Sequence, residues 1–183
     1  MMSMDSAIME TCKEGERERV KKPLCLNNSW KFWVHLPHET DWSIDSYKSI
    51  CNLDTLEESI ALIENLSESL VSNCMLFMMR KDVMPMWEDK NNIDGGSVSY
   101  KINNKNVYNI WKKLLYALLG EVLGQTPDIQ GKINGLSISP KKNFCIIKVW
   151  FASCDPDLQN TQESISVDDV ATLTTLFKPF KVE

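Results

Sequence analysis

The chain has 183 residues, of which 43% are hydrophobic and 25% are charged, and its formal net charge is −5. These proportions are typical of a globular protein, and the length suits one domain with a sizeable core. The acidic balance argues against a general nucleic-acid coat, which carries a basic surplus, but not against recognition of one nucleotide or one RNA end.

Cysteine and histidine usage argues against a metal site. The six cysteines are scattered without a C-x-x-C pair, and there are two histidines, whereas zinc sites need closely spaced ligands. Residues 1–10 are neither basic nor continuously apolar, and no apolar run is long enough to cross a membrane. We therefore expect a cytoplasmic or nuclear protein with reduced thiols and with no metal, cofactor or membrane partner.

The N-terminal residues differ from the rest of the chain. Residues 1–24 include a charged run at 13–19 without apolar periodicity, which is typical of a solvated, disordered or partly helical tail. We expect a single domain over residues 25–183. Its first predicted strand covers residues 30–35, which are rich in strand-forming types.

The next predicted element is a helix over residues 55–71. Asp54 can cap it, Glu57 lies three residues later as in a capping box, and apolar residues follow at helical spacing. Residues 74–79 are then typical of a buried strand.

A polar loop and the clearest helix follow. Residues 85–94 form the predicted loop, which closes at Gly95-Gly96, and residues 97–102 alternate as a strand. The helix covers residues 106–123, and Gly124 is expected to end it. Its apolar face contains Trp111, Leu115, Leu118 and Val122.

The last predicted elements are a hairpin and a short helix. Residues 133–138 and 144–152 form the hairpin, and residues 166–176 form the helix, with Ser166 as its cap. The hairpin favours antiparallel pairing, so we expect an α+β fold with a curved sheet and helices on one side. One face of the second hairpin strand carries Phe144, Ile146, Lys148 and Trp150.

The run Pro85-Met86-Trp87-Glu88-Asp89 places an indole beside a carboxylate on the predicted loop. An aromatic plate beside a fixed acceptor can hold a purine whose edge donates hydrogen bonds, and it holds a positively charged purine better. Five other tryptophans are available to supply a second plate.

From Leu26 to Trp150 the chain resembles the family of the cap-binding translation initiation factor 4E. The resemblance implies a cupped antiparallel sheet, with three helices on its convex face and the cap pocket on its concave side. It rests on Leu26-x-Asn28-x-Trp30-x-x-Trp33, Trp42, Asp54-Thr55-x-Glu57, Pro85-Met86-Trp87-Glu88-Asp89, Gly95-Gly96, Trp111, Leu119-Gly120-Glu121 and Trp150.

The resemblance also implies a non-enzymatic function, which is to bind the 7-methylguanosine cap of messenger RNA and recruit it for translation initiation. Trp42 and Trp87 would sandwich the base, and Glu88 would accept hydrogen bonds from the guanine N1 and N2 groups. The backbone N–H of Trp87 would meet the base O6, and Trp150 would lie against the 7-methyl group. The remaining tryptophans Trp30, Trp33 and Trp111 are expected in the core.

The phosphate side departs from the family pattern. The family usually has basic residues at the positions of Ser97, Ser139 and Ile146. Lys141 and Lys142 on the hairpin turn, and Lys148 beside Trp150, are candidate substitutes, although the turn lysines can equally be solvated. Lysine binds phosphate as a point charge, without the paired geometry of arginine. We expect weaker or rearranged phosphate contacts.

The helical back face departs further. In the family this face docks a Tyr-x-x-x-x-Leu helix of scaffold factor 4G or of 4E-binding proteins. The corresponding positions here, which we call the partner surface, have Ile60 in place of Trp and two lysines in place of Leu and Glu. A basic residue of such a helix would be repelled by lysine, so either the partner has co-adapted or the site is lost. The partner surface comprises Leu56, Ile60, Lys112, Lys113 and Tyr116.

Three alternatives remain open. The chain could be a specialised or repressor-type paralogue that holds caps without recruiting the scaffold, or an interaction domain with a vestigial pocket. A nucleotide hydrolase that uses Glu88-Asp89 with a metal is the third, but no phosphate-cradling glycine loop or well-spaced third carboxylate supports it. Only 33 residues follow Trp150, so we expect a reduced loop near the second nucleotide of the cap.

Overall fold

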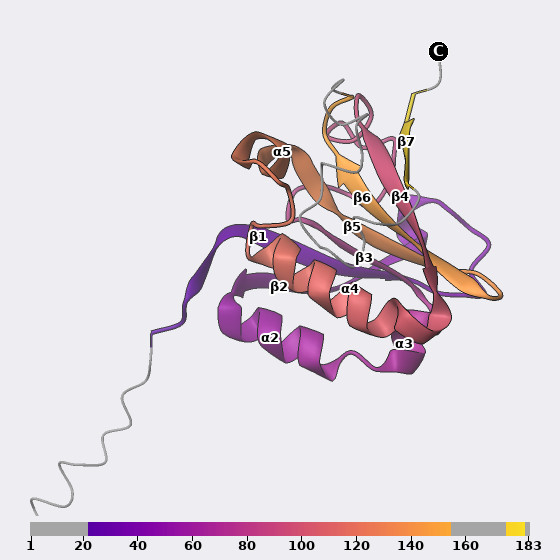
Figure 1. Ribbon diagram of the computed structural model, residues 1–183, viewed down its shortest axis with the longest axis horizontal. Coiled ribbons are helices and arrows are strands. Elements are labelled where there is room, and N and C mark those ends of the chain that lie inside the picture. The colour runs from indigo at the N-terminus through magenta and orange to yellow at the C-terminus, as the bar shows by residue number, and fades with distance from the viewer. Residues whose placement is uncertain (1–21, 155–174, 182–183) are drawn as a thin grey trace, which may run out of the picture.

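The computed structural model describes residues 22–154 and 175–181. They form a seven-stranded antiparallel sheet, in the order β2-β1-β3-β5-β6-β4-β7, with α2, α3 and α4 along one face (Figure 1). The predicted α+β class is confirmed.

The strands are β1 (Cys25–His35), β2 (Tyr47–Thr55), β3 (Met75–Arg80), β4 (Gly96–Asn103), β5 (Ile133–Pro140), β6 (Phe144–Phe151) and β7 (Thr175–Pro179). The helices are α2 (Leu56–Asn65), α3 (Glu68–Asn73), α4 (Asn104–Leu119) and α5 (Pro127–Lys132), with the 3-10 turn η1 (Ile44–Ser46).

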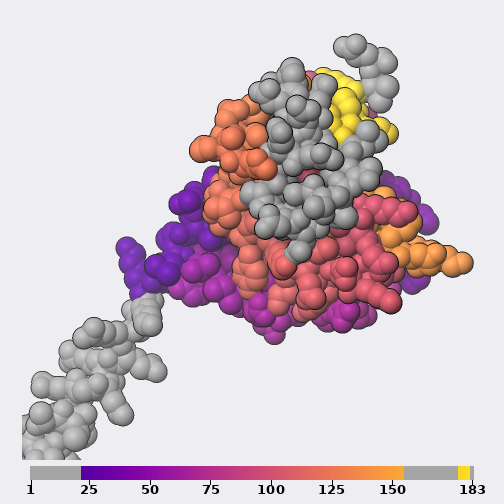
Figure 2. Space-filling model, viewed as in Figure 1, coloured from indigo at the N-terminus to yellow at the C-terminus, as the bar shows by residue number. Residues whose placement is uncertain are grey.

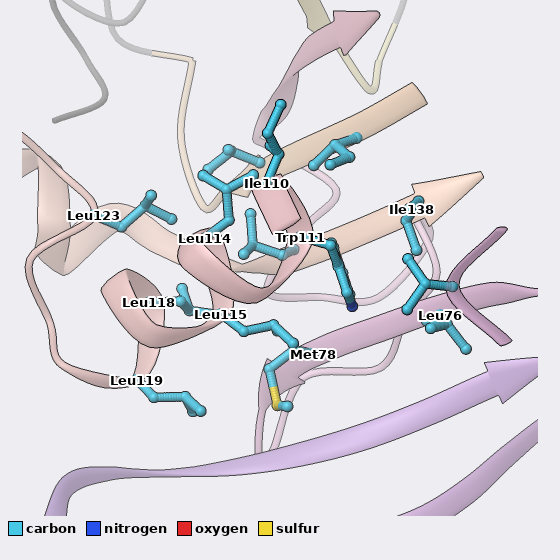
Figure 3. Close-up of a cluster of buried hydrophobic side chains, with 14 of the residues drawn as sticks. Leu76, Met78, Ile110, Trp111, Leu114, Leu115, Leu118, Leu119, Leu123 and Ile138 are labelled. Atoms are coloured by element: carbon cyan, nitrogen blue, oxygen red, sulfur yellow. The ribbon is translucent and has the colours of Figure 1, made fainter. Parts of the chain in front are cut away.

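The main core lies between α4 and the sheet. Figure 3 shows Trp111 and Leu115 of α4 directed toward Leu76 and Met78 of β3. Successive side chains of a strand point to opposite faces, so the alternate residues Phe77 and Met79 lie on the other side of the sheet. We call the two sides the helix face and the pocket face.

The pocket face carries a second, smaller apolar cluster. It gathers side chains from β1, β3, β6 and the loop after β3. Its buried members are Trp33, Phe77, Met79, Val83 and Trp150. The three tryptophans predicted in the core are indeed buried, with Trp30 and Trp111 in the helix-face cluster and Trp33 in the pocket-face cluster.

The helix predicted over residues 55–71 is wrong in two respects. It is divided into α2 and α3, because Leu66 adopts an extended conformation and is buried, and Ser67 begins a new helix by accepting a hydrogen bond from the Leu70 N–H. The cap is also one residue later than predicted. Thr55 and Glu58 form the capping box, whereas Asp54 lies in β2.

The helix predicted over residues 106–123 is shifted toward the N-terminus. Asn103 caps α4 by accepting a hydrogen bond from the Lys105 N–H, and the helix ends at Leu119 with Gly120 as its C-cap. Gly124 therefore does not end the helix. A Cβ there would lie 2.5 Å from the Gln130 backbone nitrogen, so Gly124 permits the close approach of α5.

Three further elements differ from the sequence prediction. β2 was not predicted, because Leu53 is its only buried residue and an apolar alternation is absent. The six-residue α5 is too short to show helical periodicity. The predicted helix 166–176 lies largely outside the described residues, and its final residues 175 and 176 belong to β7.

Candidate binding site on the pocket face

A pocket of ≈350 Å³ opens on the face of the sheet opposite α4. Its floor comes from alternate residues of β3, β5 and β6, whose neighbours in sequence face the helices. The loops after β1 and β3 supply its rim. The lining residues are Trp42, Tyr47, Met75, Phe77, Pro85, Met86, Trp87, Glu88, Ser137, Ser139, Lys141, Ile146, Lys148 and Trp150.

All four residues predicted to contact the base line this one pocket, together with two of the three predicted phosphate ligands. Lys142 is exposed on the hairpin turn and is absent from the lining. Ser139 and Ile146, two positions where the sequence led us to expect departures from the family pattern, also line the pocket. Two of the three departures expected on the phosphate side therefore lie at the pocket itself, whereas Ser97 lies outside its lining.

The loop that carries Trp87 and Glu88 is fixed from beneath by amide side chains. Buried Asn92 donates hydrogen bonds to the Met84 and Met86 carbonyl oxygens at 2.9 and 2.8 Å. Asn134 of β5 donates to the Asn92 amide oxygen at 2.9 Å and so ties the loop to the sheet. Trp87 nevertheless remains 49% exposed, which leaves its ring available to a ligand.

The end of this loop requires glycine. A Cβ on Gly95 would lie 1.8 Å from the Phe151 carbonyl oxygen, and one on Gly96 would lie 2.7 Å from the Lys178 carbonyl oxygen. The Gly-Gly pair thus lets β4 begin between β6 and β7. This packing sets where the preceding loop returns to the sheet.

Trp42 is held by a stacking contact that was not predicted from the sequence. Its ring lies parallel to the imidazole of His35, with 4.3 Å between centroids and 7° between planes. His35 is only 2% exposed, and its Nε2 lies 2.9 Å from the Asp41 carbonyl oxygen. Tyr47 packs edge-on against the same imidazole. Trp42 itself is 53% exposed and lines the pocket, whereas His35 does not, so the imidazole lies behind the indole.

Trp150 forms a fixed wall of the pocket. Its indole N–H donates to the Ser137 hydroxyl at 2.9 Å, and its ring packs on Phe180 with 4.8 Å between centroids. Only 6% of Trp150 is exposed. The prediction that Lys148 and Trp150 share a face of β6 is consistent with the pocket, which both residues line.

Charged groups of both signs surround the pocket. Burial, followed by the nearby positive charges of Lys178 and Lys141, lowers the pKa of Lys148. Burial and the Glu88 carboxylate raise the pKa of Tyr47. The pocket therefore has an acidic group beside Trp87 and basic groups beside Trp150.

The partner surface lies on α2 and α4, which run side by side on the helix face (Figure 2). Glu64 of α2 accepts hydrogen bonds from Lys112 at 2.8 Å and from the Tyr116 hydroxyl at 2.5 Å, both on α4. The Glu64 contact raises the pKa of Tyr116 to about 12. Lys112 is thus neutralised within the fold, whereas Leu56 and Ile60 remain partly exposed.

Within residues 22–154 and 175–181, no group of three or more metal-ligating side chains is placed to hold an ion. No helix in the same part of the chain is long and apolar enough to cross a membrane.

Residues 25–177 match the protein family described as Eukaryotic initiation factor 4E. The chain is 30% identical over 145 residues to translation initiation factor 4E of Saccharomyces cerevisiae, covering 75% of this chain and 65% of that protein. It therefore spans slightly less than two thirds of that relative's length.

The fold is similar to those of solved relatives. The schistosome eIF4E complexed with m7GpppG and 4E-BP superposes with a TM-score of 0.68 at 21% identity, over 75% of this chain and 76% of that one. Ascaris suum eIF4E-3 with the m7G cap gives a TM-score of 0.67 at 23% identity, over 76% and 79% of the two chains.

Proposed function

Because this chain belongs to the eukaryotic initiation factor 4E family, we propose that it binds the 7-methylguanosine cap of messenger RNA and recruits that RNA for translation initiation. The proposed cap-binding domain spans residues 25–183. The observation that carries the proposal is that two partly exposed indoles, Trp42 and Trp87, and the Glu88 carboxylate line one pocket.

The two indoles suit a positively charged base. Methylation at N7 gives guanine a delocalised positive charge, and indole is the best side-chain face for a cation, contributing up to about 2 kcal/mol when desolvated. Stacking of a base on an aromatic ring contributes about 1–3 kcal/mol even without the charge. In our proposal the base lies between Trp42 and Trp87, and Trp150 contacts the 7-methyl group.

The carboxylate of Glu88 gives the pocket its preference for guanine. Guanine presents the N1 and N2 donors on one edge, and adenine does not present a matching pair. Hydrogen bonds between a carboxylate and a cationic base are charge-assisted, and each contributes roughly 1.5–3 kcal/mol. The adjacent backbone N–H of Trp87 is the proposed donor to the base O6.

The phosphate chain of the cap is proposed to contact Lys141 and Lys148, both of which line the pocket. A phosphate would supply the negative charge that counters the mutual repulsion of these lysines. Lys142 lies next to Lys141 on the turn and remains a proposed outer contact.

The decisive experiment is a titration of intrinsic tryptophan fluorescence with 7-methyl-GTP and, in parallel, with GTP. We expect strong quenching and at least tenfold tighter binding of the methylated ligand, which is about 1.4 kcal/mol. Equal affinity for the two ligands would overturn the proposed cation sandwich.

A matched pair of variants separates recognition from a general charge effect. Glu88→Gln keeps the size of the side chain but removes its charge, and it should weaken 7-methyl-GTP binding by about 1–3 kcal/mol. Glu68→Gln makes the same change on α3, on the opposite side of the sheet, and should leave binding unchanged.

A second candidate function is that of a specialised or repressor-type paralogue that does not recruit the usual scaffold. It is favoured by the partner surface, where Ile60 is the apolar contact and Glu64 is already occupied by Lys112 and Tyr116. A labelled Tyr-x-x-x-x-Leu peptide with a basic flank should then bind poorly. Ile60→Trp combined with Lys113→Glu should improve its binding, whereas tight binding by the wild type would favour the initiation-factor function.

A further inference from the structure

Strand β7 brings a third lysine to the pocket face of the sheet. Ser97 of β4 lies directly opposite Lys178 on one side and directly opposite Trp150 on the other. Residues directly opposite in antiparallel strands project from the same face. Lys178 therefore projects from the face that carries Trp150 and the pocket.

Phe180, two residues after Lys178, supports this placement. Phe180 packs its ring on Trp150 with 4.8 Å between centroids, whereas Phe177 packs against the helix-face core. The alternation between Phe177, Lys178 and Phe180 places the Lys178 side chain on the pocket face, one strand beyond the pocket lining. It is exposed there, and so its amine is accessible to a ligand that leaves the pocket.

Three lysines from separate segments carry positive charge on this side of the sheet, of which Lys141 and Lys148 line the pocket and Lys178 lies outside its lining. Lys141 follows β5, Lys148 belongs to β6 and Lys178 belongs to β7, and the positive charges of Lys141 and Lys178 both act on Lys148. Within the described residues, none of the three takes part in an ion pair. Like charges held together without a counter-ion raise the free energy of the empty site, and an anion relieves this cost.

We propose that Lys178 is an anion-binding residue of this pocket, which together with Lys141 and Lys148 holds the phosphate chain of the bound nucleotide. This inference rests on the proposed function, because it places the phosphates on the Trp150 side of a base held by Trp42 and Trp87. Ser97 is buried and uncharged, and Lys178 on the adjacent strand provides a charge directly opposite it.

The test compares Lys178→Ala with the wild type against three ligands: 7-methyl-GTP, 7-methylguanosine and inorganic triphosphate. We expect the variant to bind 7-methyl-GTP roughly five- to tenfold more weakly, with a shallower salt dependence, because one charged contact to phosphate is lost. It should bind inorganic triphosphate more weakly by a similar factor. Its affinity for the phosphate-free nucleoside should be unchanged.

Lys181→Ala is the matched control, because Lys181 follows on the same segment but its amine is paired with Asp94 at 2.6 Å. It should bind all three ligands as the wild type does. Near-ultraviolet circular dichroism establishes that both variants are folded.

The outcomes distinguish the two proposals. If Lys178→Ala binds 7-methyl-GTP and triphosphate as the wild type does, or loses the nucleoside equally, the role of Lys178 is overturned and cap binding is not. If the wild type binds neither 7-methyl-GTP nor the nucleoside, the cap proposal fails. A loss of triphosphate binding in Lys178→Ala would then still support an anion site at this lysine.

Discussion

At the scale of single residues, His35 helps to fix the position of Trp42 by stacking on its ring. An exposed indole on a loop is free to adopt several rotamers, and a ligand must then select the competent one. The parallel imidazole, itself buried and in contact with the Asp41 carbonyl oxygen, limits that freedom. We therefore consider His35 a positioning residue for the proposed sandwich.

His35→Ala should weaken 7-methyl-GTP binding by about 0.5–1.5 kcal/mol, the range of an aromatic pair, through loss of this preorganisation. His35→Phe retains a flat ring and should restore most of the affinity. Fluorescence titration measures both variants. If His35→Phe binds as weakly as His35→Ala, stacking is not what positions Trp42.

Ser137 helps to fix the position of Trp150 by accepting a hydrogen bond from its indole N–H. Ser137→Ala would leave the buried indole N–H without an acceptor and should lower the free energy of unfolding by about 1–3 kcal/mol. Urea denaturation measures this loss. In the Trp150→Phe background, the same Ser137→Ala change should cost much less, because no donor remains. Equal costs in the two backgrounds would show that the hydrogen bond does not stabilise the fold.

The sequence was sufficient to nominate Trp87 and Glu88, because they place an indole beside a carboxylate on a polar loop, and the family resemblance added Trp42. It was not sufficient to find His35 or Lys178. His35 lies within an apolar strand, and its contact with Trp42 depends on how the chain turns after β1. Lys178 reaches the pocket face only through the pairing of β7 with β4.

At the scale of elements, Glu64 links α2 to α4. Its carboxylate accepts hydrogen bonds from Lys112 and Tyr116, and it raises the pKa of Tyr116 from 10.0 to about 12. A pKa raised by folding means that the protonated phenol is stabilised in the folded state. The contribution is therefore complete below pH 10 and is lost as the pH rises through about 12.

Glu64→Gln should return the pKa of Tyr116 toward 10.0, because the charged acceptor is removed. Tyrosinate absorbance during an alkaline titration follows this change. The variant should also lose less stability than the wild type between pH 10 and pH 12. Glu68→Gln, on α3, is the control. An unchanged titration of Tyr116 in Glu64→Gln would contradict the link.

The element boundaries show which signals the sequence carries well. The existence of the strongly amphipathic α4 and the position of the β5–β6 hairpin were predicted, because each buries one regular face, although α4 ends at Leu119, before the predicted end. The break between α2 and α3 was missed, because apolar spacing continues across Leu66, and only the Ser67 cap marks the new start. Edge strands such as β2 bury too little to show a pattern.

At the scale of the whole molecule, one sheet separates two apolar clusters with different tasks. The helix-face cluster is the larger and holds α4 to the sheet, whereas the pocket-face cluster supports the proposed ligand. Phe77 and Met78 are adjacent in β3 and belong to different clusters. We therefore expect a substitution on the helix face to lower stability without changing ligand affinity, and a substitution on the pocket face to lower both.

Leu115→Ala and Phe77→Ala test this separation, since both side chains are at most 2% exposed. Truncation of either should cost about 2–5 kcal/mol of stability, which urea denaturation measures. Only Phe77→Ala should also weaken 7-methyl-GTP binding, because Phe77 lines the pocket and Leu115 packs between α4 and the sheet.

Ligand at 100 times Kd stabilises a folded protein by about 2.7 kcal/mol, and Leu115→Ala should retain this increment at the wild-type Kd. If Leu115→Ala instead binds 7-methyl-GTP as weakly as Phe77→Ala, the two faces are coupled through the sheet, because a cavity beneath α4 would then have distorted the pocket on the opposite side.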